Sequence, residues 1–222
     1  MNLRNFTLSI LYNAIKILPA SARTYTYWKI RSREFGRMSV LNLSHSSDEY
    51  EAVTTAQKNE IFPVLKKYLR KSDTICLDFG CGPGRFTADL AVLMNGTCIG
   101  VDPISELIHL APKNDRVSYK VMHKGRIPLD QESVDVIWCC LVLGGIPESL
   151  LSTTVHEMLR VLRGGGLMIL IENTSAKHSG DYWMFRSAEF YRTLFPDVDL
   201  QPVHSYTDCG ETISVIIGRK KT

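Results

Sequence analysis

The stretch LDFGCGPGRFT spans Leu77–Thr87 and contains three glycines within five positions, Gly80, Gly82 and Gly84. Glycine destabilises the interior of a strand or helix, so such a cluster marks a sharp turn of the backbone or a close approach to another group. An apolar run precedes the glycines, and a helical pattern starts near Arg85. The stretch therefore predicts a strand, a tight turn and a helix, with a ligand site at the turn.

Short apolar runs rich in strand formers recur along the chain, and helical patterns separate them. The five predicted strands are residues 74–79, 97–102, 117–122, 134–143 and 167–173, and the helical patterns between and after them cover residues 85–94, 105–110, 148–162 and 187–194. Such alternation indicates a parallel sheet with helices on both faces. Two further runs, 201–207 and 212–218, are joined by a hairpin-like link, so the last strand is expected to be antiparallel. The predicted fold is α/β, with a Rossmann-like, seven-stranded, mostly parallel sheet.

The chain is expected to divide into a basic helical N-terminal cap, residues 1–47, and a main domain, residues 48–222. Residues 1–45 carry seven basic side chains and one acid, in a chain of net charge +3. Apolar residues recur at helical spacing in this segment, at Leu8, Leu11, Ile15 and Leu18. This pattern favours a helix that docks on the main domain, and it leaves open contact with a membrane surface or another anionic partner.

A helix is predicted to open the main domain and to continue to about Leu69. Asp48 is expected to be its N-cap, with Glu51 completing a capping box. Pro63 is expected to break or kink this helix.

The six cysteines are expected to be reduced thiols of a cytoplasmic protein. Cys76, Cys98, Cys139 and Cys140 lie in apolar runs, and no pair has CxxC spacing. No cysteine and histidine have the spacing of zinc ligands, so no metal is expected. A secretory signal is disfavoured because Lys16 interrupts the apolar N-terminal run.

Acidic residues at the predicted strand ends suggest the cofactor. Asp102, at the end of the second strand, is expected to accept hydrogen bonds from the ribose hydroxyls of an adenosine cofactor. An NAD site usually reads GxGxxG, but Arg85 occupies the place of the third glycine. Asp78 would repel a pyrophosphate and attract an ammonium group. The cofactor is therefore expected to carry a ribose and a positive charge, as S-adenosylmethionine does, and an NAD-dependent oxidoreductase is disfavoured.

Four stretches resemble, in order, the motifs of class I S-adenosylmethionine-dependent methyltransferases. They are LDFGCGPGRFT, IGVDPISELIHLA, GRIPLDQESVDVIW and HEMLRVLRGGGLMILIEN. The resemblance implies an S-adenosylmethionine site built from Asp78, Gly80, Cys81, Gly82, Asp102, Pro103, Ile104, His123, Cys139 and Cys140. His123 departs from the family pattern, in which an acid often contacts the adenine amino group.

Fewer residues can be assigned to catalysis at the methyl acceptor than to cofactor binding. Methyl transfer requires alignment of nucleophile and methyl group, and it needs a base only if the nucleophile arrives protonated. Many relatives carry a histidine after the fourth strand, but this chain has Gly144 and Gly145, which are expected to make room for substrate. His178, in the polar loop after the fifth strand, is the candidate catalytic base. Arg186 is expected to bind a substrate anion or to pair with Glu189.

The sequence therefore predicts methyl transfer from S-adenosylmethionine to an oxygen or nitrogen of a small molecule, such as a metabolite, natural product, sugar or lipid intermediate. Nucleic acid is disfavoured as a partner because the charge is modest and no separate RNA-binding module is recognised. Two alternatives remain open at this point: a methyltransferase acting on RNA or protein, and a non-catalytic module that retains the cofactor.

Overall fold

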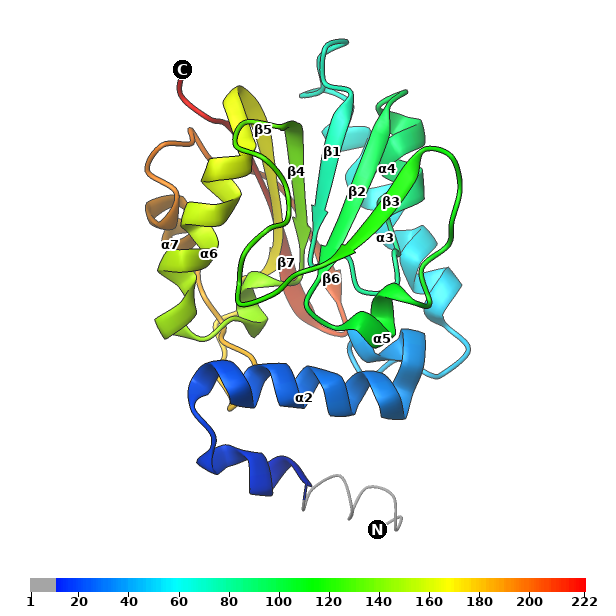
Figure 1. The fold of residues 1–222 in the computed structure, drawn as a ribbon, viewed down its shortest axis with the longest axis vertical. Coiled ribbons are helices and arrows are strands. Elements are labelled where there is room, and N and C mark those ends of the chain that lie inside the picture. The colour runs from blue at the N-terminus through cyan, green and yellow to red at the C-terminus, as the bar shows by residue number, and fades with distance from the viewer. Residues whose placement is uncertain (1–10) are drawn as a thin grey trace.

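The strands form one mixed sheet in the order β3-β2-β1-β4-β5-β7-β6, in a computed structural model that describes residues 11–222 (Figure 1). They are β1 (Ile75–Phe79), β2 (Thr97–Asp102), β3 (Val117–Val121), β4 (Val134–Cys140), β5 (Leu162–Asn173), β6 (Gln201–Asp208) and β7 (Glu211–Arg219). Pairing is parallel from β3 through β5, and β7 is antiparallel to both of its neighbours. The predicted Rossmann-like α/β fold, with its antiparallel last strand, is confirmed.

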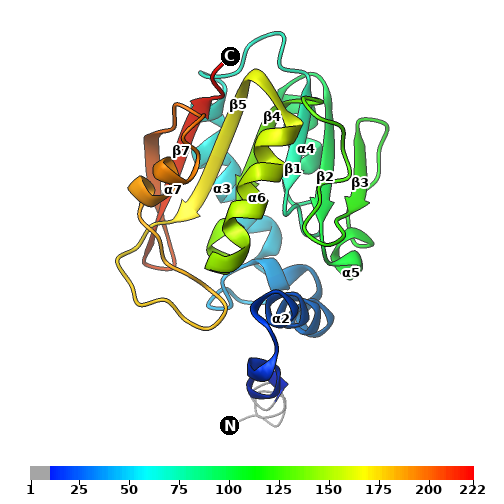
Figure 2. The same ribbon diagram turned by 60° about the vertical axis from the view of Figure 1, so that its left-hand side comes forward.

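Helices cover both faces of this sheet (Figure 2). They are α3 (Tyr50–Leu65), α4 (Thr87–Leu93), α5 (Ser105–Ile108), α6 (Glu148–Val161) and α7 (Ala188–Leu194). One buried apolar cluster joins the sheet to α6 and α7, and a second joins it to α3 and α4. In β4, Val136 and Trp138 belong to the second cluster, whereas Ile137 and Cys139 belong to the first. Burial on both faces explains why these strands are almost continuous apolar runs.

The N-terminal segment lies across the carboxyl ends of the parallel strands (Figure 1). It consists of residues 11–14, which are helical, the 3₁₀ helix η1 (Ile15–Ile17), α2 (Ala20–Phe35) and the 3₁₀ helix η2 (Gly36–Val40). The predicted boundary at residue 47 falls in the loop between η2 and α3. Leu8 of the predicted helical pattern lies outside the described residues.

Basic side chains of the N-terminal segment pair with acids of the rest of the chain. Lys29 Nζ and Arg33 NH2 lie 3.8 and 3.0 Å from Glu106 Oε1. Arg37 pairs with Glu51 at 3.0 Å. Contacts of this kind dock the segment on the main domain and reduce the positive charge that it presents to solvent. Within residues 11–222, no helix is both long enough and apolar enough to cross a membrane.

The start of α3 differs from the prediction. Glu49, rather than Asp48, is the N-cap residue, and no side chain caps the helix. The chain makes a turn just before the helix, in which the amide of Ser46 donates to Glu49 Oε2 at 2.7 Å and the amide of Glu49 to Ser46 O at 3.1 Å. This turn takes the place of the predicted capping box. Pro63 lies in the last turn of α3, and the helix ends at Leu65 rather than near Leu69.

Candidate active site

The three glycines of the opening motif form the turn between β1 and α4. Gly80, Gly82 and Gly84 have φ angles of +69°, +53° and +74°, which side chains rarely tolerate. The amides of Gly80 and Cys81 donate to Val101 O at 2.8 and 3.0 Å. The turn therefore folds over the end of β2 and brings the ends of the two strands together at one edge of the sheet.

Two buried carboxylates lie at this edge. Asp78 accepts a hydrogen bond from the hydroxyl of Thr87 at 2.6 Å, and burial raises the pKa of Asp78 to about 7. Asp102 accepts from the amides of Gly82 at 3.0 Å and Ile104 at 2.8 Å, and burial raises the pKa of Asp102 to about 6. Both groups are thus poised near neutral pH and would be stabilised in their charged forms by hydrogen-bond donors or a cation in the adjacent space.

A cavity of about 920 Å³ opens at the same edge, between the sheet and the N-terminal segment. Eight of the ten predicted cofactor-binding residues line it: Asp78, Gly80, Cys81, Asp102, Pro103, Ile104, His123 and Cys140. Such a volume is at the upper end of the range for ligand pockets, on the order of 300–1,000 Å³. The structure thus brings most of the predicted set to one cavity.

Three predicted site residues do not line the cavity. A Cβ atom on Gly82 would lie 2.9 Å from Val40 Cγ1, so this glycine permits close packing of the N-terminal segment. Cys139 is fully buried in the cluster under α6 and α7, because it faces the side of β4 opposite to Trp138. His178 is exposed in the loop between β5 and α7.

Arg85 lines the cavity, whereas in the sequence its position only disfavours NAD. Its Nε donates to Thr54 Oγ1 at 3.2 Å and its NH2 donates to Gln57 Oε1 at 2.7 Å. Burial lowers the pKa of Arg85, which nevertheless remains a cation. Among residues 11–222, no carboxylate forms an ion pair with it, so a charged group without a counterion faces the cavity close to Asp78.

Glu172 organises the loop after β4, a role that was not predicted from the sequence. Its Oε1 accepts from the amides of Val142 and Leu143 at 3.0 and 2.8 Å, and its Oε2 accepts from the amide of Gly144 at 3.2 Å. Burial raises the pKa of Glu172 to about 7. A buried acid at the end of an apolar strand, next to a loop with unpaired amides, was the available signal.

Arg186 also holds this loop, which corrects its predicted role. It donates from NH1 to Leu143 O at 2.7 Å and from NH2 to Ile146 O at 3.0 Å, and it is nearly buried. The predicted partner, Glu189, pairs instead with Arg192 at 2.6 Å. The guanidinium therefore stabilises the backbone of the 3₁₀ helix η3 (Leu143–Gly145) and its neighbour and is not free to bind a substrate anion.

Two tryptophans fill the space beside the glycine pair, where room for substrate was expected. A Cβ atom on Gly144 would lie 2.6 Å from Trp183 Cζ2, and one on Gly145 would lie 3.3 Å from Trp28 Cζ2. Trp28 and Gly145 line the cavity, but Gly144 and Trp183 do not. The expectation is therefore wrong for Gly144, whose missing side chain makes room for an indole of the protein itself.

An aromatic stack joins the N-terminal segment to the loop that carries Trp183. The rings of Tyr27 and Tyr182 are parallel within 4°, with centroids 4.0 Å apart. The hydroxyl of Tyr182 donates to Tyr12 O at 2.8 Å. Two parts of the chain that are distant in sequence thus form one cover at the carboxyl edge of the sheet.

Comparisons with known proteins agree with this geometry. Residues 76–166 match the family model of a methyltransferase domain. No curated protein matches the chain. Similar solved structures include the YcgJ protein of Bacillus subtilis, with 14% identity and a TM-score of 0.62 over 72% of this chain and 98% of that one. A S-adenosylmethionine-dependent methyltransferase of Methanosarcina mazei has 21% identity and a TM-score of 0.59 over 73% and 99%.

A third similar structure is a complex of the Trm112 methyltransferase activator with a putative methyltransferase of Haloferax volcanii. It has 18% identity and a TM-score of 0.59 over 79% of this chain and 96% of that one. At such identities, these likenesses concern the fold.

The fold and the cavity at its carboxyl edge define a Rossmann-like α/β protein of the kind that binds a nucleoside. The family match identifies residues 76–166 as a methyltransferase domain. Together with the fold, this match supports an enzyme of the class I S-adenosylmethionine-dependent methyltransferase type, with S-adenosylmethionine as its methyl donor.

Proposed function

We propose that the enzyme methylates an oxygen or nitrogen of a small, largely uncharged molecule. The observation that carries this proposal is the lining of the cavity between α2 and α6. Of the described residues there, those contributed by the ranges 21–28 and 145–154 are all uncharged: Ser21, Ala22, Thr24, Tyr25, Trp28, Gly145, Ile146, Pro147, Leu150, Thr153 and Thr154. An apolar wall with scattered hydroxyl groups suits a small organic acceptor better than a polyanion.

Three of the four charged side chains that line the cavity, Asp78, Asp102 and Arg85, suit the cofactor, and the fourth is Lys124. Asp78 would accept hydrogen bonds from the ammonium group of the methionine part, and Arg85, which also lines the cavity, would donate hydrogen bonds to its carboxylate. Asp102 retains lone pairs for the ribose hydroxyls beyond the two amides that it already accepts. Pro103 and Ile104 would pack against the adenine. Both carboxylates and one of the two cations, Arg85, are thus explained without any contribution from the acceptor, and the other cation, Lys124, follows the end of β3.

The chain's own contribution to the reaction is positioning. S-adenosylmethionine supplies a methyl group on a sulfonium, which is already a good leaving group. The cavity walls from α2 and α6 would hold the acceptor atom in line with that methyl group, and such alignment alone lowers a barrier by several kcal/mol. Glu172 and Arg186 fix the loop that joins β4 to α6, and therefore the wall that α6 provides.

His178 stays a prediction as the catalytic base. It is exposed and lies outside the cavity in the structure. His178→Ala should leave cofactor affinity unchanged. A large loss of rate with the methyl acceptor would assign it a catalytic role, and an unchanged rate would support a reaction that depends on alignment alone.

The docked N-terminal segment supports a small acceptor over RNA. Its basic side chains at Lys16, Lys29, Arg33 and Arg37 form ion pairs with acids outside the segment. Arg31 donates to the carbonyls of Ser39 and Leu41 at 2.6 and 2.7 Å. These contacts leave fewer free cations for phosphates or lipid headgroups. The six free thiols support the cytoplasm as the proposed location.

Two measurements in sequence test this proposal. Calorimetric titration with S-adenosylmethionine and S-adenosylhomocysteine, with NAD in parallel, should show micromolar binding of the first two and none of NAD. The enzyme is then incubated with methyl-labelled S-adenosylmethionine and, separately, with a low-molecular-mass cell extract, total RNA and total protein. We expect label only in the first. Label in RNA or protein would overturn the small-molecule proposal, and cofactor binding without transfer to any fraction would favour the non-catalytic alternative.

A further inference from the structure

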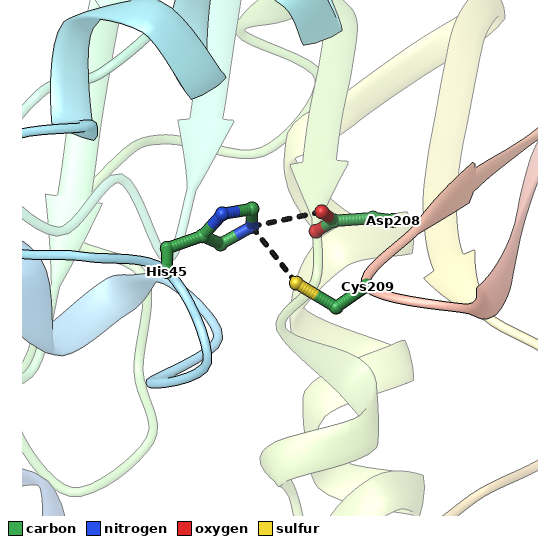
Figure 3. A group of neighbouring side chains, drawn as sticks. All are labelled: His45, Asp208 and Cys209. Atoms are coloured by element: carbon green, nitrogen blue, oxygen red, sulfur yellow. Dashed lines mark hydrogen bonds and ion pairs between the residues drawn. The ribbon is translucent and has the colours of Figure 1, made fainter.

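Three side chains with metal-ligating atoms meet outside the cavity (Figure 3). His45 comes from the loop between η2 and α3, Asp208 is the last residue of β6, and Cys209 follows it in the turn before β7. His45 Nε2 lies 2.8 Å from Asp208 Oδ1 and 3.3 Å from Cys209 Sγ. The three donor atoms lie within 4.8 Å of one another. The cluster is therefore a separate candidate site.

Both contacts of the imidazole in this cluster involve the same nitrogen. An imidazole nitrogen carries at most one proton, so Nε2 cannot serve both the carboxylate and the sulfur with full hydrogen bonds. A nucleophile–histidine–acid triad would place the thiol and the carboxylate on opposite ring nitrogens. Figure 3 shows instead that the oxygen and the sulfur approach Nε2 together. Three donors that converge on one point favour a cation between them over a proton relay.

The spacing of these donors suits a tetrahedral ion. With zinc bond lengths of about 2.0–2.3 Å, neighbouring ligand atoms lie roughly 3.3–3.6 Å apart. The observed separation of 3.3 Å lies at the lower end of this range, and the separation of 2.8 Å is shorter by a few tenths of an ångström, so small rotations of the side chains are sufficient. The side chains of His45 and Asp208 are 15% and 16% exposed, and Cys209 is exposed, which provides an entry path.

Polar groups lie behind two of the ligands, at ion-pair distance from His45 and at hydrogen-bond distance from Asp208. Glu49 Oε2 lies 3.7 Å from His45 Nδ1, the ring nitrogen that faces away from the cluster. Gln57 Nε2 donates to Asp208 Oδ2 at 3.4 Å. Metal-ligating histidines usually have a carboxylate or carbonyl on the second nitrogen, which fixes the ring. No lysine or arginine among residues 11–222 pairs with Glu49 or Asp208 to neutralise the site.

The turn that presents Cys209 is well defined. Asp208 and Glu211 pair across it, and its two central residues, Cys209 and Gly210, have φ angles of +48° and +74°. Asparagine or glycine is the usual residue at the first of these positions. A cysteine in this place carries its thiol beside His45, at a backbone conformation that disfavours it.

We propose that His45, Asp208 and Cys209 bind one divalent transition-metal ion, with Zn²⁺ as the ion best matched to one nitrogen, one sulfur and one oxygen ligand and water in the fourth position. The ligands His45 and Cys209 are 164 positions apart in the chain, so no local sequence spacing indicates the site. The ion would join the loop that follows the N-terminal segment to the C-terminal hairpin. It would thereby stabilise the docked position of that segment over the cavity.

The proposal is tested with the full chain, purified with a chelator and kept reduced. Titration with Co²⁺ should give the visible absorption of a tetrahedral site and a thiolate-to-cobalt band at a stoichiometry of one, and Zn²⁺ should displace the cobalt. Cys209→Ser should abolish the thiolate band. His45→Gln should weaken Zn²⁺ binding by more than the roughly 10–100-fold expected for the outer residue Glu49→Gln.

His204→Gln is the matched control, since His204 Nε2 lies 3.1 Å from Glu60 Oε2 with no sulfur in that pair. It should bind Co²⁺ and Zn²⁺ like the wild-type chain. Circular dichroism checks the fold of each variant, and His45→Gln and Cys209→Ser alter different segments, so one suffices if the other fails to fold. Absence of stoichiometric binding, or binding that survives both substitutions, would overturn the proposal.

Discussion

Glu172 Oε1 accepts a hydrogen bond from the amide of Leu143 at 2.8 Å, within a group of three amides that this one buried carboxylate binds. The contact links the end of β5 to the loop after β4, which carries the wall of the cavity formed by residues 145–147. Arg186 binds the carbonyls of the same loop from the other side. The carboxylate of Glu172 thus accepts from the amides and the guanidinium of Arg186 donates to the carbonyls. Together they hold a loop that has little regular structure of its own.

Replacing Glu172 with glutamine should therefore destabilise the enzyme. The amide side chain retains one acceptor oxygen and gains donors, so at least one loop amide loses its partner. We expect the free energy of unfolding to fall by about 1–3 kcal/mol. Thermal or denaturant unfolding measures this loss. Glu189→Gln is the control, because Glu189 is largely exposed and its loss should be within about 0.5 kcal/mol. Equal stabilities of the two variants would contradict the role of Glu172.

The pair Gly144 and Trp183 predicts a steric effect. A Cβ atom on Gly144 would approach the indole to 2.6 Å, so Gly144→Ala should displace Trp183 and cost about 1–3 kcal/mol of stability. Tryptophan fluorescence and thermal unfolding report both effects. Gly180→Ala lies in the same loop as Trp183, with nothing within 4 Å of the added atom, and should be nearly neutral. A Gly144→Ala enzyme with the stability and fluorescence of the wild type would show that the indole is not packed there.

The motif strands and their glycine turn could be predicted from the sequence because their causes are local. Strands β1 and β4 are buried on both faces, so their residues are apolar in succession. Gly80 stands where the backbone must adopt a positive φ. The boundary of β5 was less accurate: it starts at Leu162 rather than at residue 167, because the glycine-rich run after α6 pairs with its neighbours instead of forming a separate turn.

The parts of the site that could not be predicted depend on contacts between distant segments. The packing of Trp28 and Trp183 against consecutive glycines follows from how α2 and the loop after β5 are placed, which no short pattern encodes. The same holds for the meeting of His45 with Cys209. Arg186 was assigned to a substrate anion or to its neighbour Glu189, whereas its partners are carbonyls 43 and 40 positions away in the chain.

Asp102 provides a test of the cofactor site. Asp102→Asn keeps the size of the side chain but replaces one acceptor oxygen with a donor, so it should weaken S-adenosylmethionine binding by about 1–3 kcal/mol. Calorimetry measures the change. Asp115→Asn alters an exposed acid outside the cavity and should bind like the wild type. If the two variants bind equally well, Asp102 does not hold the ribose.

The raised pKa of Asp78 predicts a pH dependence of binding. Its pKa of about 7 lies above the usual 3.8, so the empty enzyme keeps this proton at mildly acidic pH. Because the folded enzyme holds this proton more tightly than the unfolded chain, Asp78 contributes to the free energy of unfolding. This contribution is complete below about pH 4 and is lost as pH rises through about 7. The affinity for the cofactor depends on pH in the opposite direction, because an ammonium group pairs only with the ionised carboxylate. S-adenosylmethionine affinity should therefore rise between about pH 5 and about pH 8, and Asp78→Asn should bind weakly with a flatter profile. A wild-type profile without this rise would exclude the pairing.

Arg85 yields the most specific prediction about the cofactor, since it is a cation beside the cavity whose described partners, Thr54 and Gln57, are neutral. If it binds the carboxylate of the methionine part, Arg85→Gln should weaken S-adenosylmethionine by about 1.5–3 kcal/mol, as expected for a hydrogen bond to a charged group. The same substitution should hardly change the affinity for decarboxylated S-adenosylmethionine, which lacks that group, so the two ligands form a double-mutant cycle with the side chain. Equal losses for both ligands would mean that Arg85 acts on the shape of the turn rather than on the carboxylate. Unchanged affinity for both ligands would mean that Arg85 does not bind the cofactor and is available to the methyl acceptor. The proposed uncharged acceptor would then have to be replaced by an anionic one.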